Sequence, residues 1–258
     1  MLTLRVLGPN VMRIAFLADI HANLEALEAC RADLRSRAVD RIVYLGDIVG
    51  YGADPSACIE IIRADCTSRG ARAIMGNHDE AVEGSRFRLN GSAEAAMRWT
   101  RCVLDAEQKR FLAALPMTIE EEGRLYVHAS AAKPASFPYV HGLHEARDSL
   151  TATEAKFAVI GHVHAPALYH MSVTGKVMGF VPVVDTPIPL STQRRWLAVM
   201  GAVGQPRDGN PAAAYGILET DANEITFVRV PYDVDRAAAK IRSAGLPDVL
   251  WKRLSTGR

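Results

Sequence analysis

Short apolar runs alternate with helical patterns along the first half of the chain. The runs at 14–18, 42–45, 71–75 and 157–160 have the length and composition of buried β-strands. After the first run, apolar residues recur with helical spacing behind Asn23, a favourable N-cap. Asp54 and Pro55 combine an N-cap with a proline at the first helical position, and they predict a second helix through Ala64. This alternation is typical of sheets covered by helices.

The second half is richer in strands. We expect two helices within 92–115, a hairpin at 118–127 that turns at Gly123, strands at 167–173, 176–181, 196–200, 212–219 and 224–230, and closing helices at 233–243 and 247–254. No stretch has the composition of a linker. The pattern therefore predicts an α/β sandwich in a single domain, residues 1–258, with residues 1–11 as a loose extension before the first strand.

Composition limits the partners of this chain. Its 258 residues are 49% hydrophobic and 23% charged, which is typical of a globular protein, and 30 basic residues nearly balance 29 acidic ones. We therefore expect neither bulk nucleic-acid binding nor a membrane surface as partner, and no apolar stretch reaches the ~20 residues of a membrane span. There is no recognisable secretory signal and no CxxC pair. We expect a cytoplasmic protein with buried, reduced thiols at Cys30, Cys58, Cys66 and Cys102.

Polar residues with metal-binding or titratable side chains follow five of the apolar strands. In open α/β sheets, ligands bind at the carboxyl ends of the strands. The five segments that directly follow these strands, called strand exits below, are therefore expected to meet in one crevice. At three of the exits a glycine precedes the polar residue and permits a sharp turn. The exits carry Asp19 and His21, Asp47, Asn77 with His78 and Asp79, His128, and His162 with His164.

Seven of these side chains, all except His78 and Asp79, are taken as ligands: two carboxylates, one amide and four imidazoles, without a thiolate. This set suits Mn²⁺, Fe, Zn²⁺, Co²⁺ or Ni²⁺ and disfavours Ca²⁺ or an iron–sulfur cluster. Seven ligands are too many for one tetrahedral ion and suffice for two ions that keep open positions. Two divalent cations with two carboxylates and a bridging hydroxide leave the site positive, which favours a phosphate substrate. The predicted cofactor is thus a pair of divalent transition-metal ions, with Mn²⁺ as first choice.

The order of these blocks, from Asp-x-His at residue 19 to Gly-His-x-His at residue 161, resembles the calcineurin-like metallophosphoesterase superfamily. Residues 203–215, VGQPRDGNPAAAY, further resemble a bacterial and archaeal subgroup of predicted phosphodiesterases. The resemblance implies a double β-sheet sandwich flanked by helices. It implies one metal held by Asp19, His21 and His164 and a second held by Asn77, His128 and His162, with Asp47 bridging the two.

The resemblance also assigns His78 as the catalytic histidine that is not a ligand, and Asp79 as the carboxylate that orients it. The implied activity is hydrolysis of a small phosphodiester, such as a nucleotide, through a metal-bridging hydroxide. Ala22 stands where many members have glycine, and 199–202, VMGA, replaces Asn-Pro-Gly-Ser, which leaves the substrate class open. The alternatives are a phosphomonoesterase or protein phosphatase, a dinucleoside polyphosphate hydrolase, and a non-catalytic scaffold on the same fold.

Three further residues are weaker candidates. Arg207, on a turn-rich loop, is either a phosphate-binding residue or an exposed turn arginine. Asn23 is a helix cap first and a substrate contact second. Tyr51, between two glycines, either stacks on a base or belongs to an ordinary turn. His141 and His144 are expected in a loop and His170 at the surface, and the sequence does not indicate an oligomeric state.

Overall fold

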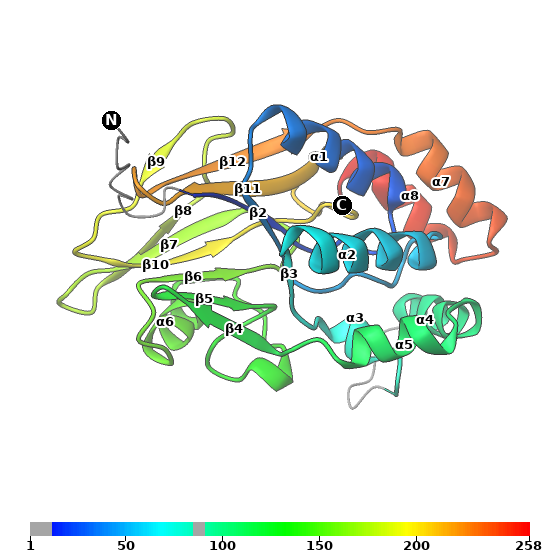
Figure 1. Cartoon of the computed structure of the whole chain (residues 1–258), viewed down its shortest axis with the longest axis horizontal. Coiled ribbons are helices and arrows are strands. Elements are labelled where there is room, and N and C mark those ends of the chain that lie inside the picture. The colour runs from blue at the N-terminus through cyan, green and yellow to red at the C-terminus, as the bar shows by residue number, and fades with distance from the viewer. Residues whose placement is uncertain (1–11, 85–90) are drawn as a thin grey trace, which may run out of the picture.

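In the computed structural model, which describes residues 12–84 and 91–258, two mixed β-sheets lie face to face between layers of helices (Figure 1). The expected extension at residues 1–11 lies outside the described part. The first sheet has the order β3-β2-β1-β11-β12-β9 and the second β4-β5-β6-β10-β7-β8. The α/β double-sheet fold expected from the sequence is therefore confirmed.

The strands of the first sheet are β1 (Arg13–Leu17), β2 (Arg41–Tyr44), β3 (Arg72–Ala73), β9 (Ile188–Pro189), β11 (Ala213–Glu219) and β12 (Glu224–Val230). Those of the second are β4 (Thr118–Glu121), β5 (Arg124–Val127), β6 (Phe157–Ile160), β7 (Ala167–Met171), β8 (Val177–Phe180) and β10 (Arg195–Val199). In each sheet three adjacent strands are parallel, β1 to β3 in the first and β5, β6 and β10 in the second. The short strand β9 has no counterpart in the sequence prediction.

The side chains of β1 point alternately to its two faces and pack in two different apolar clusters. Ile14 and Phe16 point into the apolar cluster between the sheets, where Tyr126 and Trp196 of the second sheet meet them. The intervening residues of β1 pack in a separate cluster against helices of the outer layer. A strand buried on both faces reads as a continuous apolar run, which is the pattern seen in the sequence.

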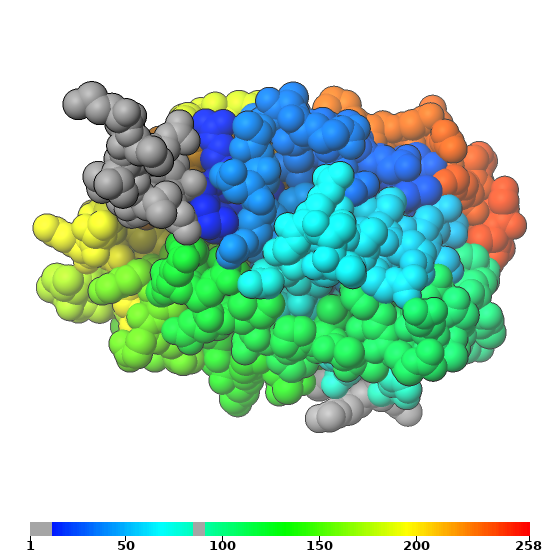
Figure 2. Space-filling view, in the orientation of Figure 1, coloured from blue at the N-terminus to red at the C-terminus, as the bar shows by residue number. Residues whose placement is uncertain are grey.

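The outer layers are helical. Helices α1 (Leu24–Ser36) and α2 (Pro55–Arg69) cover the first sheet, and α6 (Leu143–Thr151) covers the second. Seen from the side of Figure 2, α1 and α2 lie together above α4 and α5 and form a closed surface. The remaining helices are α3 (Asn77–Glu80), α4 (Gly91–Val103), α5 (Ala106–Ala113), the 3-10 turn η1 (Pro134–Ser136), α7 (Val234–Ser243) and α8 (Asp248–Thr256). No helix in the described ranges is long and apolar enough to span a membrane.

Several local expectations need correction. Helix α2 begins at Pro55 as predicted, but the carboxylate of Asp54 makes no cap bond and pairs instead with Lys240 at 2.8 Å, and the helix runs on to Arg69. His144 lies in α6 rather than in a loop. His170 is buried beside Trp196, not on the surface. All four cysteines are free, yet Cys66 is half-buried and Cys102 is exposed.

Candidate metal centre

The polar residues that follow the parallel strands of both sheets meet at the carboxyl ends of these strands. Backbone hydrogen bonds join the strand exits to one another. The N–H of Asp19 donates to the carbonyl of Gly46 at 3.1 Å, and the N–H of Gly161 donates to the carbonyl of His128 at 2.9 Å. The N–H of Gly204 donates to the carbonyl of Asp19, also at 2.9 Å. Turns from both sheets therefore form one scaffold.

The turns hold their side chains in an uncommon backbone conformation. Five non-glycine residues at the exits have φ between 48° and 65°, in the left-handed region. Such conformations cost energy, and they persist where the surrounding structure imposes them, typically at functional sites. The five residues are Asp19, His21, Asp47, His162 and His164.

Two glycines allow the turns to approach one another. A Cβ on Gly76 would lie 2.2 Å from both the backbone nitrogen and the Oδ1 of Asp47. A Cβ on Gly161 would lie 2.6 Å from the Oδ2 of Asp19. Any larger residue would push these carboxylates away, which explains why glycine precedes the polar residue at these exits.

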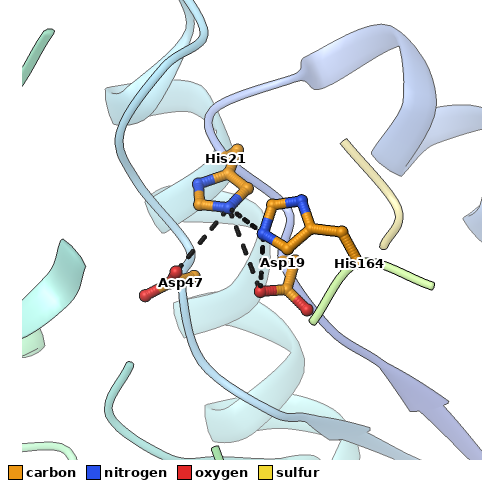
Figure 3. A group of neighbouring side chains, drawn as sticks. All are labelled: Asp19, His21, Asp47 and His164. Carbon is orange, nitrogen blue, oxygen red and sulfur yellow. Dashed lines mark hydrogen bonds and ion pairs between the residues drawn. The ribbon is translucent and has the colours of Figure 1, made fainter. Parts of the chain in front are cut away.

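The first group of side chains brings together Asp19, His21, Asp47 and His164, all buried (Figure 3). Nε2 of His164 lies 3.3 Å from the Oδ1 of Asp19, and Nε2 of His21 lies 3.6 Å from the Oδ2 of Asp47. The two Nε2 atoms are only 3.1 Å apart. Figure 3 shows the four side chains, from three separate strand exits, pointing toward one another.

The second group brings Asp47 together with His128 and His162. The Oδ2 of Asp47 lies 3.5 Å from Nε2 of His128, and the Oδ1 of Asn77 lies 3.3 Å from the same nitrogen. Asp47 therefore belongs to both groups through a single oxygen. Its other oxygen accepts a hydrogen bond from the backbone N–H of His78 at 2.8 Å, which fixes the orientation of the carboxylate.

Backbone carbonyls determine which ring nitrogen faces the centre. Nδ1 of His21, His128 and His164 lies 3.1, 2.7 and 2.7 Å from the carbonyl oxygens of Val49, Leu45 and Gln205, respectively. A carbonyl can only accept, so each Nδ1 carries the proton, and in the neutral ring Nε2 offers a lone pair to the centre. This arrangement of a backbone oxygen behind a histidine is typical of metal ligands.

These donors fit divalent metal ions. The Nε2 lone pairs of His21 and His164 face each other at 3.1 Å, which is unfavourable unless a cation or a proton lies between them. Nε2 of His162 is buried and has no hydrogen-bond partner among the described residues. Oxygen and imidazole ligands without sulfur match the transition metals expected from the sequence.

The charges of the centre shift the pKa values of its groups. Burial, together with the charge of the neighbouring His128, lowers the pKa of His162 to about 3. Burial would also lower the pKa of His128, but the charge and hydrogen bond of Asp47 outweigh it and raise that pKa to about 9. Burial raises the pKa of Asp47, yet His128 and His78 hold it well below the ordinary range. The protein without metal thus gathers positive charge beside Asp47, where a cation would otherwise lie.

His78 lies at the edge of the centre and is 3% exposed. Its ring packs between His21 and Tyr51, with ring centroids 5.0 and 4.5 Å away, and its Nδ1 has no hydrogen-bond partner among the described residues. Burial lowers its pKa. The structure thus places His78 beside both groups without bringing it into either.

Asp79 does not contact the imidazole of His78 through a hydrogen bond, contrary to the orienting contact expected from the resemblance. Its Oδ1 accepts from the backbone N–H groups of Ile48 and Val49 at 2.9 and 3.2 Å, and its Oδ2 accepts from that of Gly76 at 3.0 Å. Asp79 therefore joins the turn after β2 to the turn after β3.

The residues considered for substrate binding lie on the Gly204 side of the centre. The cap function of Asn23 is confirmed: its Oδ1 accepts from the N–H of Ala26, and its Nδ2 donates to the carbonyl of Gly204 at 2.8 Å. These bonds occupy its amide in the fold. The guanidinium of Arg207 lies 5.5 Å from the ring centroid of Tyr51, and its Nη2 donates to the Oε1 of Gln205 at 2.9 Å.

Sequence reasoning missed two residues of the centre. Gln205 supplies the carbonyl behind His164, and Tyr139 stacks on His162 with ring centroids 4.0 Å apart. Gln205 contacts His164 only through its backbone carbonyl, so its side-chain type carries no signal for that contact. Tyr139 lies in a loop without periodicity, and an aromatic residue shortly after His128 is a weak signal by itself. Tyr51, considered for base stacking, is 7% exposed and packs on His21 instead.

Two stacked sheets with a buried cluster of carboxylates and imidazoles at the carboxyl ends of their parallel strands define a metallophosphoesterase fold and site. Residues 12–223 match the family model described as the calcineurin-like phosphoesterase superfamily domain, and the chain belongs to this superfamily.

Known proteins resemble the whole chain. A protein of Methanocaldococcus jannaschii, described as uncharacterized, is 37% identical over 252 residues, which cover 95% of this chain and 98% of that protein. The crystal structure of a metallophosphoesterase from Sphaerobacter thermophilus is similar with a TM-score of 0.84 and 36% identity, over 96% of this chain and 100% of that one. A hypothetical protein from Pyrococcus horikoshii shares the fold, with a TM-score of 0.77 and 18% identity over 95% and 98% of the two chains.

Proposed function

We propose that this protein is a dinuclear-metal-dependent phosphoesterase that hydrolyses a small phosphodiester. The observation that carries the proposal is the position of Asp47. One oxygen of its carboxylate lies 3.6 Å from Nε2 of His21 and 3.5 Å from Nε2 of His128, between the two ligand groups. A buried carboxylate shared in this way suits a ligand that bridges two cations.

The two groups divide the ligands between two ions, with Mn²⁺ as the first candidate. Asp19, His21 and His164 would hold one ion and Asn77, His128 and His162 the other. When bound, a pair of divalent ions supplies activation of water and electrostatic stabilisation of the phosphoryl oxygens during in-line displacement. The protein contributes rigid positions, since carbonyl bonds and buried turns hold the ligands before any ion arrives.

His78 is the candidate for the leaving group. Its lowered pKa favours a neutral imidazole at neutral pH, and a neutral imidazole retains one N–H. That N–H can donate a hydrogen bond to the leaving oxygen and stabilise the charge that develops there. The unpartnered Nδ1 and the tight packing against Tyr51 are consistent with a ring held for such a contact.

Arg207 is the candidate for substrate phosphate binding. The backbone N–H of Arg207 donates to the carbonyl of His164 at 3.0 Å, so this loop is tied directly to a ligand turn. Nη2 and Nε of Arg207 donate to the Oε1 of Gln205 at 2.9 and 3.3 Å, which orients the guanidinium for contact with an anion. One arginine beside a dinuclear centre, on a chain with a net charge of +1, favours a small phosphoester over a long nucleic acid. The free thiols support our further proposal of a cytoplasmic location.

The decisive experiment is hydrolysis by protein reconstituted with Mn²⁺, Ni²⁺, Zn²⁺ or Mg²⁺. Bis(p-nitrophenyl) phosphate and p-nitrophenyl phosphate are compared side by side, with the metal-free protein as control. We expect metal-dependent turnover that is faster on the diester. Faster turnover of the monoester would favour a phosphomonoesterase on the same site, and binding of two ions without turnover of either compound would favour a scaffold.

A further inference from the structure

Three of the four candidate ligand imidazoles have the same support. A backbone carbonyl lies behind Nδ1 of His21, His128 and His164 and prevents rotation of each ring. The described part of the chain shows no such carbonyl bond for His162. Its Nε2 is buried and meets no hydrogen-bond partner within residues 12–84 and 91–258, so the side chain needs another means of keeping one orientation.

The ring of Tyr139 covers one face of His162. The two rings are stacked, with centroids 4.0 Å apart and an interplanar angle of 22°. His141 lies parallel to Tyr139 in turn, with centroids 5.0 Å apart and an angle of 8°. The three rings therefore form a column that runs from the metal centre to the exposed His141.

Tyr139 is well fixed although 47% of its surface is exposed. Its loop lies between η1 and α6, and buried side chains anchor it on both sides of the tyrosine. Phe137 is 6% exposed and lies near His128, and Val140 is 1% exposed and belongs to the apolar cluster beneath α6. A tyrosine held in this way presents a rigid face to His162.

We propose that Tyr139 is a positioning residue for the second metal ion, since its ring orients His162 by stacking where the other ligands rely on backbone carbonyls. The inference rests on the proposed function, because it takes His162 to be a metal ligand. The face of the ring makes the contact, and the phenolic hydroxyl is not required. Tyr139 thus acts through His162 and controls the occupancy of one ion only.

The experiment measures binding of Mn²⁺ to metal-free protein by isothermal titration calorimetry. In Tyr139→Leu we expect the affinity for one ion to fall about 10-fold, the lower end of what supporting partners of metal ligands contribute. The affinity for the other ion, held by Asp19, His21 and His164, should not change. Tyr139→Phe should restore both affinities, since it keeps the ring. His141→Ala is the matched control and should bind as the wild type does, because the ring contact of His141 in the column is with Tyr139, on which His162 stacks in turn.

The outcomes separate this inference from the proposed function. If the wild type binds fewer than two ions, the dinuclear proposal fails. If the wild type binds two and Tyr139→Leu binds both with unchanged affinity, only the role of Tyr139 is overturned. A loss in Tyr139→Phe equal to that in Tyr139→Leu would assign the effect to the hydroxyl and would also overturn the proposal. Thermal unfolding of the metal-free variants checks that the half-exposed position tolerates leucine.

Discussion

Gly50 offers a way to move the imidazole of His78 without replacing it. A Cβ at this position would lie 2.4 Å from Nδ1 and 3.0 Å from Cγ of His78, whereas ordinary van der Waals contact begins at 3.4 Å. In Gly50→Ala the ring must therefore shift by about 1 Å. A misplacement of about 1 Å can cost a catalytic step about 100-fold. We expect kcat on the aryl diester to fall about 100-fold while two ions remain bound, because His78 is not a ligand.

The substitution also has a cost that is unrelated to His78. Gly50 has φ +90°, and alanine in the left-handed region loses about 1–2 kcal/mol of stability. Gly123→Ala is the matched control, because Gly123 has φ +72° and its Cβ would meet nothing within 4 Å. Gly123 lies in the β4–β5 turn, at the end of β5 opposite the metal centre. The control should be destabilised by a similar amount in urea denaturation and should turn over as the wild type does.

A double-substitution cycle tests whether the loss occurs through His78. In the His78→Ala background there is no imidazole to displace, so adding Gly50→Ala should not slow turnover further. Turnover of Gly50→Ala at the rate of Gly123→Ala would refute the reasoning. An equal loss in the presence and absence of His78 would do the same, since it would assign the effect to the turn itself.

The other predictions concern the ligands and the charge of the centre. His78→Ala should keep two ions per chain by elemental analysis and lose about 10²–10⁴-fold in kcat, and full activity would remove His78 from the mechanism. Asp47→Asn should weaken both ions together, so unchanged metal stoichiometry would contradict the bridging role. In metal-free protein the lowered pKa of His162, about 3, contributes stability that is present above pH 6.5 and lost as the pH falls toward 3. The raised pKa of His128, about 9, contributes stability that is present below pH 6.5 and lost as the pH rises toward 9. The urea midpoint should therefore be highest near pH 6.5, and a flat profile from pH 5 to 8 would argue against both shifts.

Much of the centre could be predicted because the relevant signals are local. Each apolar run marks a strand, and a polar residue directly after it must lie at the carboxyl end. Parallel strands place these ends at one edge of a sheet, so Asp19 and Asp47 converge without knowledge of the packing. His162 follows β6 of the second sheet, and the packing of the two sheets brings it to them. The cap at Asn23 is equally local, since donor and acceptor are three residues apart.

Long-range contacts explain the predictions that were wrong or missing. Asp54 stands at the N-cap position that its sequence context predicts, but its carboxylate pairs with Lys240, which is distant in the sequence and close in the fold. Asp79 follows His78 directly, yet its Oδ1 accepts from the turn after β2, about 30 residues earlier. Tyr139 contacts His162 only because the loop before α6 is anchored beneath that helix. Residue type and spacing do not encode these distances.

The sequence pattern alone therefore determined an α/β sandwich and the set of side chains at the strand exits, because strand periodicity and turn chemistry act over a few residues. The division of the strands into two sheets was implied only by the resemblance to the superfamily. Tertiary structure decided which nitrogen of each imidazole faces the centre, which carboxylate is shared, and which ring supports His162. Those choices depend on hydrogen bonds and ring contacts between distant segments. Such contacts are sensitive to shifts of less than 1 Å, and only the packed fold sets positions that finely.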